Sequence, residues 1–338
     1  MLLNPSDIRN ILIIKLRAIG DVVLSTPVLE NLRSAFPEST IDFLVESNSH
    51  DVLSGNPYLS TILVFEPKRQ NGIGLIRKVR SRNYDLVIDL FGNPRSALVT
   101  LASGARYRLG YRFGWRRLCY NIVVEPRGGE VHNVEFNLDA LRRIGVPVIR
   151  STPFFPLLQA SENFADEFFS RSGLKSKPVI AFNPGGGWYT KRWRPQQFAK
   201  LGRLIVDRLG KRILVMWGPG ELEDARQIAS GIGQEAILAP PSSLSQFASL
   251  MKRCSMVVTN DSGPMHIAAS VGIPIVAIFG PTRPEFQGPV GTTAVIVRNS
   301  ELTCLGCNLT KCPIGNPCME ELTAERVYEA VASVMEKI

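Results

Sequence analysis

The chain has 338 residues, 45% of them hydrophobic and 20% charged, with a net charge of +9 and a pI of about 9.4. This composition is ordinary for a globular protein and excludes wholesale disorder and collagen-like or coiled-coil structure. No apolar run approaches the roughly 20 residues that span a bilayer, and the first one, residues 11–14, is too short for a signal-peptide core. We therefore expect a cytoplasmic protein with two domains of about 150 residues each. The basic charge indicates an anionic partner.

Short apolar runs rich in β-branched residues alternate with helical patterns along the whole chain. We expect nine buried strands, at residues 11–15, 41–45, 62–65, 86–90, 179–182, 213–217, 256–259, 275–279 and 295–297. Helices are expected between many of them, for example over residues 195–209 and 243–253. Continuous apolar strands that alternate with helices predict an α/β fold with parallel sheets covered on both faces.

The strand and helix pattern runs through the chain twice. Proline, glycine and polar residues interrupt it between residues 151 and 177. We therefore expect a first domain over residues 1–160 and a second over residues 175–322. A final helix over residues 323–338 is expected to pack back on the first domain. Two doubly wound domains bind ligands in a cleft outside the carboxyl ends of their strands.

A tight turn follows the first expected strand. Gly20 allows the chain to bend there, and Asp21 stands at the carboxyl end of the strand. A carboxylate in that position can act as a general base toward a substrate hydroxyl, or it can simply cap the helix that follows. The dinucleotide-binding fingerprint is excluded, because it needs three glycines where this turn has one.

A glycine-rich loop over residues 183–193 opens the second half of the chain. Gly186 and Gly187 can expose successive backbone amides to an anion, and Thr190 and Lys191 follow with a hydroxyl and a positive charge. The spacing of a Walker loop is absent. The loop is either a phosphate site, which we favour, or a flexible turn with a solvated basic edge.

The strongest pattern lies after the strand expected over residues 256–259. Asp261, Ser262 and Gly263 lead into an alanine-rich helix, whose free amides and positive end suit a diphosphate. Asp261 is expected to cap the helix or to hold a hydroxyl rather than to contact phosphate. His266, one turn into the helix, is either a core residue or a ligand contact.

Two further turns follow strands of the second half. Glu221 comes after a Trp-Gly-Pro-Gly turn and can accept hydrogen bonds from a ribose diol, or can simply favour the first turn of a helix. Residues 280–282, Gly-Pro-Thr, form another small turn at the same expected sheet edge.

Basic residues are concentrated between residues 68 and 117, where only Asp85 and Asp89 oppose them and the net charge is +10. The twelve basic residues are Lys68, Arg69, Arg77, Lys78, Arg80, Arg82, Arg95, Arg106, Arg108, Arg112, Arg116 and Arg117. An anionic lipid-linked acceptor or an acidic membrane surface would explain them, at about 1 kcal/mol per basic residue near the surface. A solvated face is the alternative. Nucleic acid is not expected as a partner, because no nucleic-acid-binding module is legible.

Four of the six cysteines fall in one short segment, at Cys304, Cys307, Cys312 and Cys318. The first two have the spacing of metal ligands, but the second two do not repeat it and no histidine is near. A thiolate metal site, a disulfide and reduced thiols all remain open. A cytoplasmic location favours reduced thiols, and we expect no cofactor.

Taken together and in order, these motifs resemble glycosyltransferase family 9, the bacterial heptosyltransferases of lipopolysaccharide core assembly. The resemblance covers nearly the whole chain, including residues 89–110. It implies a GT-B fold, in which two Rossmann-like domains face a central cleft, and an inverting transfer of heptose from ADP-heptose to an anionic lipid-linked acceptor. It also implies that Asp21 is the base and Lys191 a diphosphate contact.

The resemblance extends to the remaining site residues. It places the donor against Gly186, Gly187, Thr190, Lys191, Glu221, Asp261, Ser262, Gly263 and His266. We expect the acceptor to contact Arg17, Gly20, Arg95, Arg112 and Arg116. The Asp-x-Asp motif that holds a metal-bound diphosphate in other transferases is absent, so we expect activity without a divalent ion.

Two other functions remain open. The protein can be a transferase of the same fold that uses another nucleotide sugar for a different cell-surface glycan, or a nucleotide-sugar-binding protein without activity. In the preferred reading it acts at the cytoplasmic face of the inner membrane as a peripheral protein. The sequence leaves the oligomeric state open.

Overall fold

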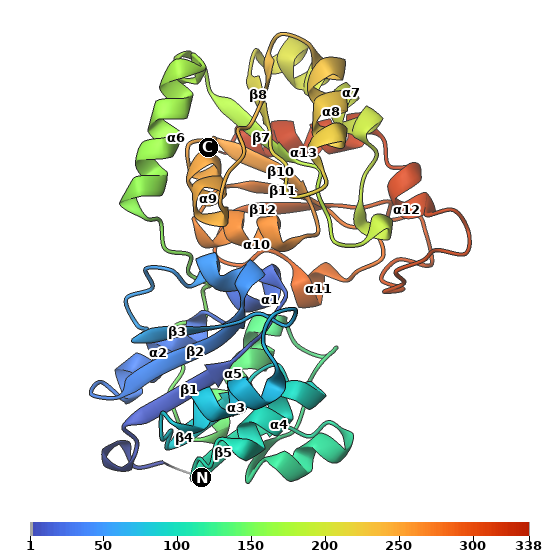
Figure 1. Ribbon diagram of the computed structural model, residues 1–338. Helices are drawn as coiled ribbons and strands as arrows, with labels where there is room; N and C mark the ends of the chain where they lie inside the picture. The colour runs from blue at the N-terminus through green and yellow to red at the C-terminus, as the bar shows by residue number, and fades with distance from the viewer. Residues whose placement is uncertain (1–2, 338) are drawn as a thin grey trace. The chain divides into compact units, whose positions relative to one another are not determined.

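The computed structural model describes residues 3–337 and divides the chain into two compact units, Met1–Pro156 and Leu157–Ile338 (Figure 1). Each unit contains one six-stranded sheet in which all neighbouring strands are parallel. The strand order is β3-β2-β1-β4-β5-β6 in the first sheet and β9-β8-β7-β10-β11-β12 in the second. Both follow the order of a doubly wound nucleotide-binding fold, so the α/β prediction is confirmed.

The first unit contains six strands and five α-helices. Its strands are β1 (Asn10–Ile14), β2 (Thr40–Glu46), β3 (Thr61–Phe65), β4 (Leu86–Asp89), β5 (Tyr107–Tyr111) and β6 (Ile122–Val124). Its α-helices are α1 (Ile19–Val23), α2 (Pro27–Ala35), α3 (Gly72–Arg80), α4 (Pro94–Ala102) and α5 (Asn133–Arg143). Short 3-10 helices lie at η1 (Pro5–Asp7), η2 (Ser47–Val52) and η3 (Gly114–Cys119).

The second unit also contains six strands. They are β7 (Val179–Asn183), β8 (Arg212–Val215), β9 (Ala236–Leu238), β10 (Met256–Asn260), β11 (Ile275–Ile278) and β12 (Ala294–Val297). Its α-helices are α6 (Gln159–Arg171), α7 (Pro195–Leu209), α8 (Leu222–Ile232), α9 (Leu244–Lys252), α10 (Gly263–Ser270), α11 (Pro284–Gln287), α12 (Pro317–Glu320) and α13 (Ala324–Met335). Two 3-10 helices lie at η4 (Leu174–Ser176) and η5 (Tyr189–Lys191).

The central strands are buried on both faces, which explains why they read as continuous apolar runs. In β1, residues 11–14 are all fully buried. Leu12 and Ile14 pack with Leu75 of α3 and Val99 of α4, so these two helices cover one face of the first sheet. In the second unit, α7, α8 and α13 pack on the sheet face that carries Phe182.

All nine expected strands are present, and three more are found. The additional strands are β5, β6 and β9. The first carries Arg108 and Gly110 within it, and the other two have only three residues each. Only β5 lacks a continuous apolar run, whereas β6 and β9 are apolar but very short.

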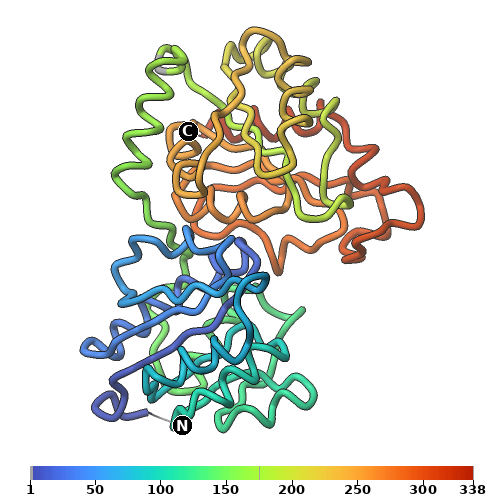
Figure 2. Tube along the Cα trace, in the orientation of Figure 1, coloured from blue at the N-terminus to red at the C-terminus, as the bar shows by residue number. Residues whose placement is uncertain are grey.

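The final helix packs within the second unit. We expected it to pack back on the first domain, but its buried residues lie in the core of the second. Val327, Val331 and Val334 of α13 belong to the core of the second unit, where the helix packs on α7, β11 and β12. Figure 2 shows this last stretch of the chain running within the second unit. An amphipathic pattern shows that one helix face is buried, but it does not identify the surface that buries it.

No helix within residues 3–337 has the length and apolar character needed to cross a membrane.

Candidate functional site

The carboxyl ends of β7, β10 and β11 are joined by a buried ion pair. Lys191, in η5 after β7, places its Nζ 2.7 Å from Oδ2 of Asp261, which follows β10. Thr282, after β11, donates a hydrogen bond of 2.6 Å from its hydroxyl to the same oxygen. The Asp261 side chain is 3% exposed and that of Lys191 is 13% exposed. Three loops far apart in the sequence thus meet at one pair of charges.

The Lys191 ammonium also faces an aromatic ring. Its Nζ lies 4.6 Å from the centre of the Trp188 ring, a cation–π distance. Asp261 and Trp188 therefore hold the cation in place from two sides. A charge that is fixed before a ligand arrives does not have to reorganise when an anion binds, which strengthens its interaction with that anion.

Two asparagines fix the backbone around this pair. The side-chain amide of Asn183 donates to the hydroxyls of Thr259, at 3.0 Å, and Ser262, at 3.3 Å. The amide of Asn260 donates to the Pro184 carbonyl at 2.6 Å. Both side chains are almost fully buried. The loops after β7 and β10 are therefore held together by side-chain hydrogen bonds as well as by the ion pair.

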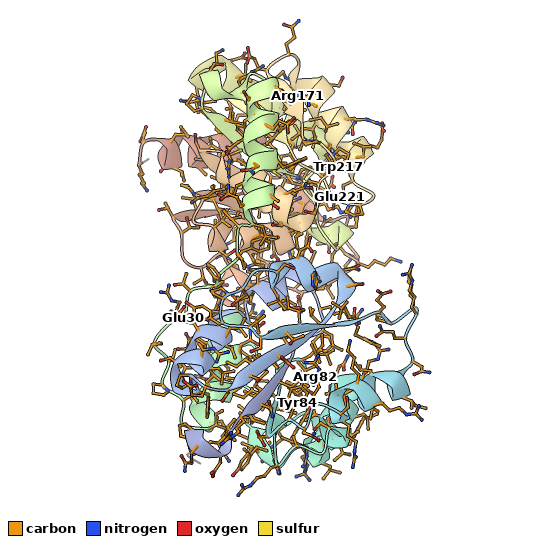
Figure 3. All side chains as sticks on the ribbon, turned by 60° about the vertical axis from the view of Figure 1, so that its left-hand side comes forward. Glu30, Arg82, Tyr84, Arg171, Trp217 and Glu221 are labelled. Atoms are coloured by element: carbon orange, nitrogen blue, oxygen red, sulfur yellow. The ribbon has the colours of Figure 1, made fainter. Side chains whose placement is uncertain are left out.

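Glu221 ties the loop after β8 to the glycine-rich loop after β7. Its carboxylate accepts hydrogen bonds from the backbone amides of Gly218, at 2.9 Å, and Gly186, at 3.2 Å. A Cβ on Gly185 would come within 2.3 Å of this carboxylate, so the close approach requires glycine there. Figure 3 shows Glu221 beside Trp217 in this part of the second unit. The Gly186 amide, expected to face an anion, donates to Glu221 instead.

The remaining predicted donor residues lie near the start of α10 and in η5. Ser262 is the N-cap of α10 and has extended backbone geometry, and among the described residues its side chain makes no capping hydrogen bond to the first turn. The Gly263 end of the helix keeps its positive dipole available to an anion. His266 is buried one turn further on. Thr190 is also buried, and its hydroxyl donates to the Leu309 carbonyl at 2.9 Å.

In the first unit, Asp21 lies in the short helix α1 that follows β1. One of its carboxylate oxygens accepts a hydrogen bond of 3.1 Å from the Ala18 amide, so the capping role considered for it is present. The side chain is half-buried, Gly20 is buried and Arg17 is exposed. This hydrogen bond orients the carboxylate.

A buried lysine, Lys15, and a buried aspartate, Asp89, lie near Asp21. Lys15 donates from Nζ to the Leu90 carbonyl at 3.1 Å. Burial lowers the pKa of Lys15, and the charges of Asp21 and Asp89 oppose that shift. The ammonium is therefore close enough to both carboxylates to interact with them electrostatically.

Asp89, at the end of β4, accepts hydrogen bonds from three groups. These are the backbone amides of Phe91, at 3.0 Å, and Gly92, at 2.8 Å, and the Tyr120 hydroxyl, at 2.7 Å. Burial raises the pKa of Asp89, and these hydrogen bonds act against the rise. A Cβ on Gly110 would come within 2.4 Å of the Tyr120 ring, so this strand glycine makes room for the tyrosine.

The arginines expected to bind the acceptor follow β4 and β5. Arg95 stacks its guanidinium 5.1 Å from the centre of the Phe65 ring, and Arg112 pairs with Glu125 at 2.6 Å on the surface. Arg116 is committed to the protein itself, since it donates to the Gly92 carbonyl at 2.5 Å and to the Phe113 carbonyl at 3.0 Å. Arg95 and Arg112 keep about half of their side-chain surface exposed and can meet an anion.

The cysteine segment contains free thiols. Cys304 and Cys307 are exposed, Cys312 is half-buried and Cys318 is buried. Burial raises the pKa of Cys318 to about 11, and the three other thiols add to the rise, so the four groups lie near one another. Within residues 3–337, no cluster of three or more cysteine, histidine or acidic side chains has an arrangement that could hold a metal ion.

The predicted residues thus fall into two sets. Those expected to bind the donor lie on loops at the carboxyl edge of the second sheet, and those expected to act as base or bind the acceptor lie at the carboxyl edge of the first. Their roles stay predictions. Sequence reasoning missed Lys15 and Asp89, which look like ordinary ends of apolar strands. It also did not select Asn183 or Thr282, although both lie in the turns that it identified.

Comparison with known proteins adds independent evidence. Residues 73–317 match the family model of glycosyltransferase family 9, described as heptosyltransferase. Lipopolysaccharide heptosyltransferase 2 of Escherichia coli K12 is 26% identical over 312 residues, which cover 85% of this chain and 87% of that protein.

Solved structures show the same fold. A family 9 glycosyl transferase from Veillonella parvula superposes with a TM-score of 0.87 at 28% identity and covers 98% of both chains. The ADP-heptose lipopolysaccharide heptosyltransferase II of E. coli gives a TM-score of 0.80 at 24% identity, covering 97% of this chain and all of that one. The two Rossmann-like units are therefore those of a GT-B fold.

Proposed function

Because the chain belongs to glycosyltransferase family 9, we propose that it moves a heptose from ADP-heptose to the inner core of lipopolysaccharide, with inversion at the anomeric carbon. Membership of the family supports glycosyl transfer as the reaction class. The donor and acceptor are proposed from the names of its relatives, which are lipopolysaccharide and ADP-heptose heptosyltransferases.

The buried pair of Lys191 and Asp261 is the observation that carries the donor assignment. It holds an ammonium group at the sheet edge where the positive end of α10 also lies. The diphosphate of the donor would bind against Lys191 and the Gly263 end of α10. Glu221, already fixed by two backbone amides, would accept hydrogen bonds from ribose hydroxyls through its remaining lone pairs.

Asp21 is proposed as the general base. The acceptor oxygen would form a bond to the anomeric carbon while the bond from that carbon to the ADP phosphate oxygen breaks. The acceptor proton would pass to Asp21, and ADP would leave with the bonding electron pair. Lys191 and the α10 dipole would stabilise the negative charge that grows on the leaving phosphate.

The acceptor is proposed to be an anionic lipid-linked glycan that meets Arg17, Gly20, Arg95, Arg112 and Arg116. A peripheral position at the cytoplasmic face of the inner membrane would bring the enzyme to such a substrate. We further propose that the reaction needs no divalent ion, because Lys191 and the α10 end supply positive charge to the diphosphate. Loss of activity with a chelator and its recovery with magnesium would overturn that part.

Nucleotide binding is the first experiment. Thermal unfolding is measured with ADP, UDP, GDP and CMP, with and without magnesium. A ligand present at 100 times its Kd stabilises the folded protein by about 2.7 kcal/mol. We expect a shift with ADP in both conditions. A shift with UDP or GDP instead would indicate another donor, and no shift with any of them would remove the support for donor binding.

A transfer assay then tests the base. With ADP-heptose and a Kdo-lipid A acceptor, Asp21→Asn should lower the rate by about 100-fold or more, the range of general base catalysis, while the ADP shift persists. Asp51→Asn is the matched control, since Asp51 is a surface carboxylate of the same unit that pairs with His50. Unchanged transfer in Asp21→Asn would remove Asp21 from the mechanism.

A further inference from the structure

The outer faces of three adjacent elements of the first unit expose large apolar side chains. They belong to α3, α4 and η3, and we call this surface the α3–α4–η3 face. Its exposed apolar residues are Ile73, Leu98, Leu101, Trp115 and Leu118. Half of the large hydrophobic side chains that are exposed within residues 3–337 lie in these three elements. Exposed apolar side chains that gather on neighbouring elements are typical of an interaction site.

The three elements are packed neighbours. Helix α3 packs against α4, and α4 packs against η3. Figure 1 shows α3 and α4 next to each other in the first unit. Leu98 and Leu101 are three residues apart and therefore lie on the same side of α4. The opposite side of that helix carries Val99, which is buried in the core, so α4 is apolar on both sides.

Exposed basic residues lie in two of the same three elements. Arg77, Lys78 and Arg80 lie in α3 and are exposed, as is Arg117 in η3. The two acidic residues between residues 68 and 117 have partners elsewhere in the protein. Asp89 is fully buried, and Asp85 accepts hydrogen bonds from the backbone amides of residues 9 and 10. The surface is therefore both basic and apolar.

We propose that the α3–α4–η3 face docks the enzyme onto an anionic lipid bilayer. Basic side chains would meet the phosphate groups, and Trp115 with the leucines would enter the boundary between headgroups and acyl chains. The charge complementarity favours a bilayer over a protein partner, whose apolar contact patch would have to carry matching acidic residues around it. The mixture of leucine and tryptophan with arginine also argues against RNA, which offers no apolar layer.

The position of the face agrees with the proposed function, on which the choice of a bilayer partly rests. Helix α4 begins at the carboxyl end of β4, with Arg95 in its first turn, and η3 follows the carboxyl end of β5. The acceptor arginines and the apolar side chains thus share the same elements. Docking by this face would bring a lipid-linked acceptor to the sheet edge that holds Asp21.

Vesicle binding tests the proposal directly. The protein is sedimented with vesicles of 70% phosphatidylcholine and 30% phosphatidylglycerol, and with vesicles of phosphatidylcholine alone. We expect binding to the anionic vesicles, weakened by salt, and weak binding to the neutral ones. Leu98→Ser with Leu101→Ser should lower the partition coefficient about tenfold or more, and Arg77→Gln should lower it about fivefold.

Two controls distinguish insertion of this face into the bilayer from nonspecific binding to vesicles. Ile314→Ser removes a side chain as exposed as Ile73, at 64% for both, but from the second unit, and should bind vesicles like the wild type. Trp115 fluorescence should shift to the blue with anionic vesicles, and this change should vanish in Trp115→Phe. Folding of each variant is checked by thermal unfolding, which should be unaltered because the replaced side chains are exposed.

The outcomes distinguish this surface from the proposed reaction. Transfer to a deacylated, soluble acceptor should be unchanged in Leu98→Ser with Leu101→Ser. Normal transfer by a wild-type protein that does not bind anionic vesicles would overturn the docking surface alone. Vesicle binding that is equal in the wild type and the leucine variant would also overturn it, as would self-association that disappears in that variant.

Discussion

Lys191 and Asp261 form a buried ion pair at the carboxyl edge of the second sheet, with Nζ 2.7 Å from Oδ2. The aspartate also accepts from Thr282, so its negative charge has two donors. The lysine has a fixed counter-charge before any nucleotide is present. In the proposed diphosphate site, the role of Asp261 would be to position Lys191 rather than to meet the phosphate.

Removal of one member of this pair should destabilise the protein. Lys191→Met and Asp261→Asn are each expected to lower the free energy of unfolding by about 3 kcal/mol, because each leaves a buried charge without its partner. The double variant should recover part of that loss but not the ADP-induced thermal shift. Urea unfolding measures the first effect and thermal unfolding with ADP the second.

A surface pair of the same length supplies the control. Lys200 and Glu325 also lie 2.7 Å apart, but each side chain is 49% exposed. Lys200→Met should therefore cost less than about 1 kcal/mol. Equal losses for Lys191→Met and Lys200→Met would contradict the role assigned to burial.

Gly185 offers a second test of the donor loops. Gly185→Ala would place a Cβ within 2.3 Å of the Glu221 carboxylate. The carboxylate would have to move away from the two backbone amides that donate hydrogen bonds to it. Two backbone amides would lose their acceptor, at about 1 kcal/mol for each net hydrogen bond. We expect weaker ADP binding by isothermal titration calorimetry and lower stability.

Gly187→Ala is the matched substitution in the same loop. A Cβ there meets no described atom within 4 Å, so the free energy of unfolding should stay within about 0.5 kcal/mol of the wild-type value. If Gly185→Ala were equally mild, the fit between Gly185 and Glu221 would not matter for the loop.

The elements of the fold were largely predictable because the strands are buried on both faces. Residues 11–14 and 275–278 read as continuous apolar runs for that reason. Strand β5 was missed because Gly110 and Arg108 interrupt the run, and the Tyr120 ring fills the space beside the glycine. That contact depends on the tertiary structure, so local patterns do not contain it.

The sequence predicted the loops of the candidate site but not the side-chain contacts between them. Small residues after apolar strands point to ligand-binding turns, and the turns found this way follow the carboxyl ends of strands in both sheets. The contact of Glu221 with Gly186 spans 35 residues and that of Asn183 with Ser262 spans 79, so spacing could not reveal either. Lys15 escaped notice because a charged residue at the end of an apolar strand normally turns to solvent.

The cysteine segment should react as a set of free thiols. Cys304 and Cys307 are exposed, whereas burial raises the pKa of Cys318 to about 11 and also raises that of Cys254. At pH 8 we expect fast reaction of the two exposed thiols with a disulfide reagent and slow reaction of the buried ones. Cys304→Ser with Cys307→Ser should remove the fast phase, and Cys254→Ser should leave it intact. A fast phase that appears only after treatment with a chelator would show a bound metal instead.

Asp89 should make stability depend on pH in a direction opposite to that of most carboxylates. Burial raises its folded pKa above the ordinary value, so the folded protein binds this proton to higher pH than the unfolded chain does. Its contribution to stability therefore falls as the pH rises from about 4 toward the folded pKa, by about 1.4 kcal/mol for each pH unit traversed. Asp89→Asn removes this titration but keeps an oxygen that can accept from the amides of Phe91 and Gly92.

Urea unfolding at pH 4 and pH 6 measures the effect. The variant should gain stability relative to the wild type between the two pH values, because only the wild type must then hold a buried charge. Asp51→Asn, which changes a surface carboxylate, should keep a constant difference from the wild type. A difference between Asp89→Asn and the wild type that does not change with pH would show that the surrounding amides, the Tyr120 hydroxyl and the nearby Lys15 ammonium fully offset the burial of Asp89.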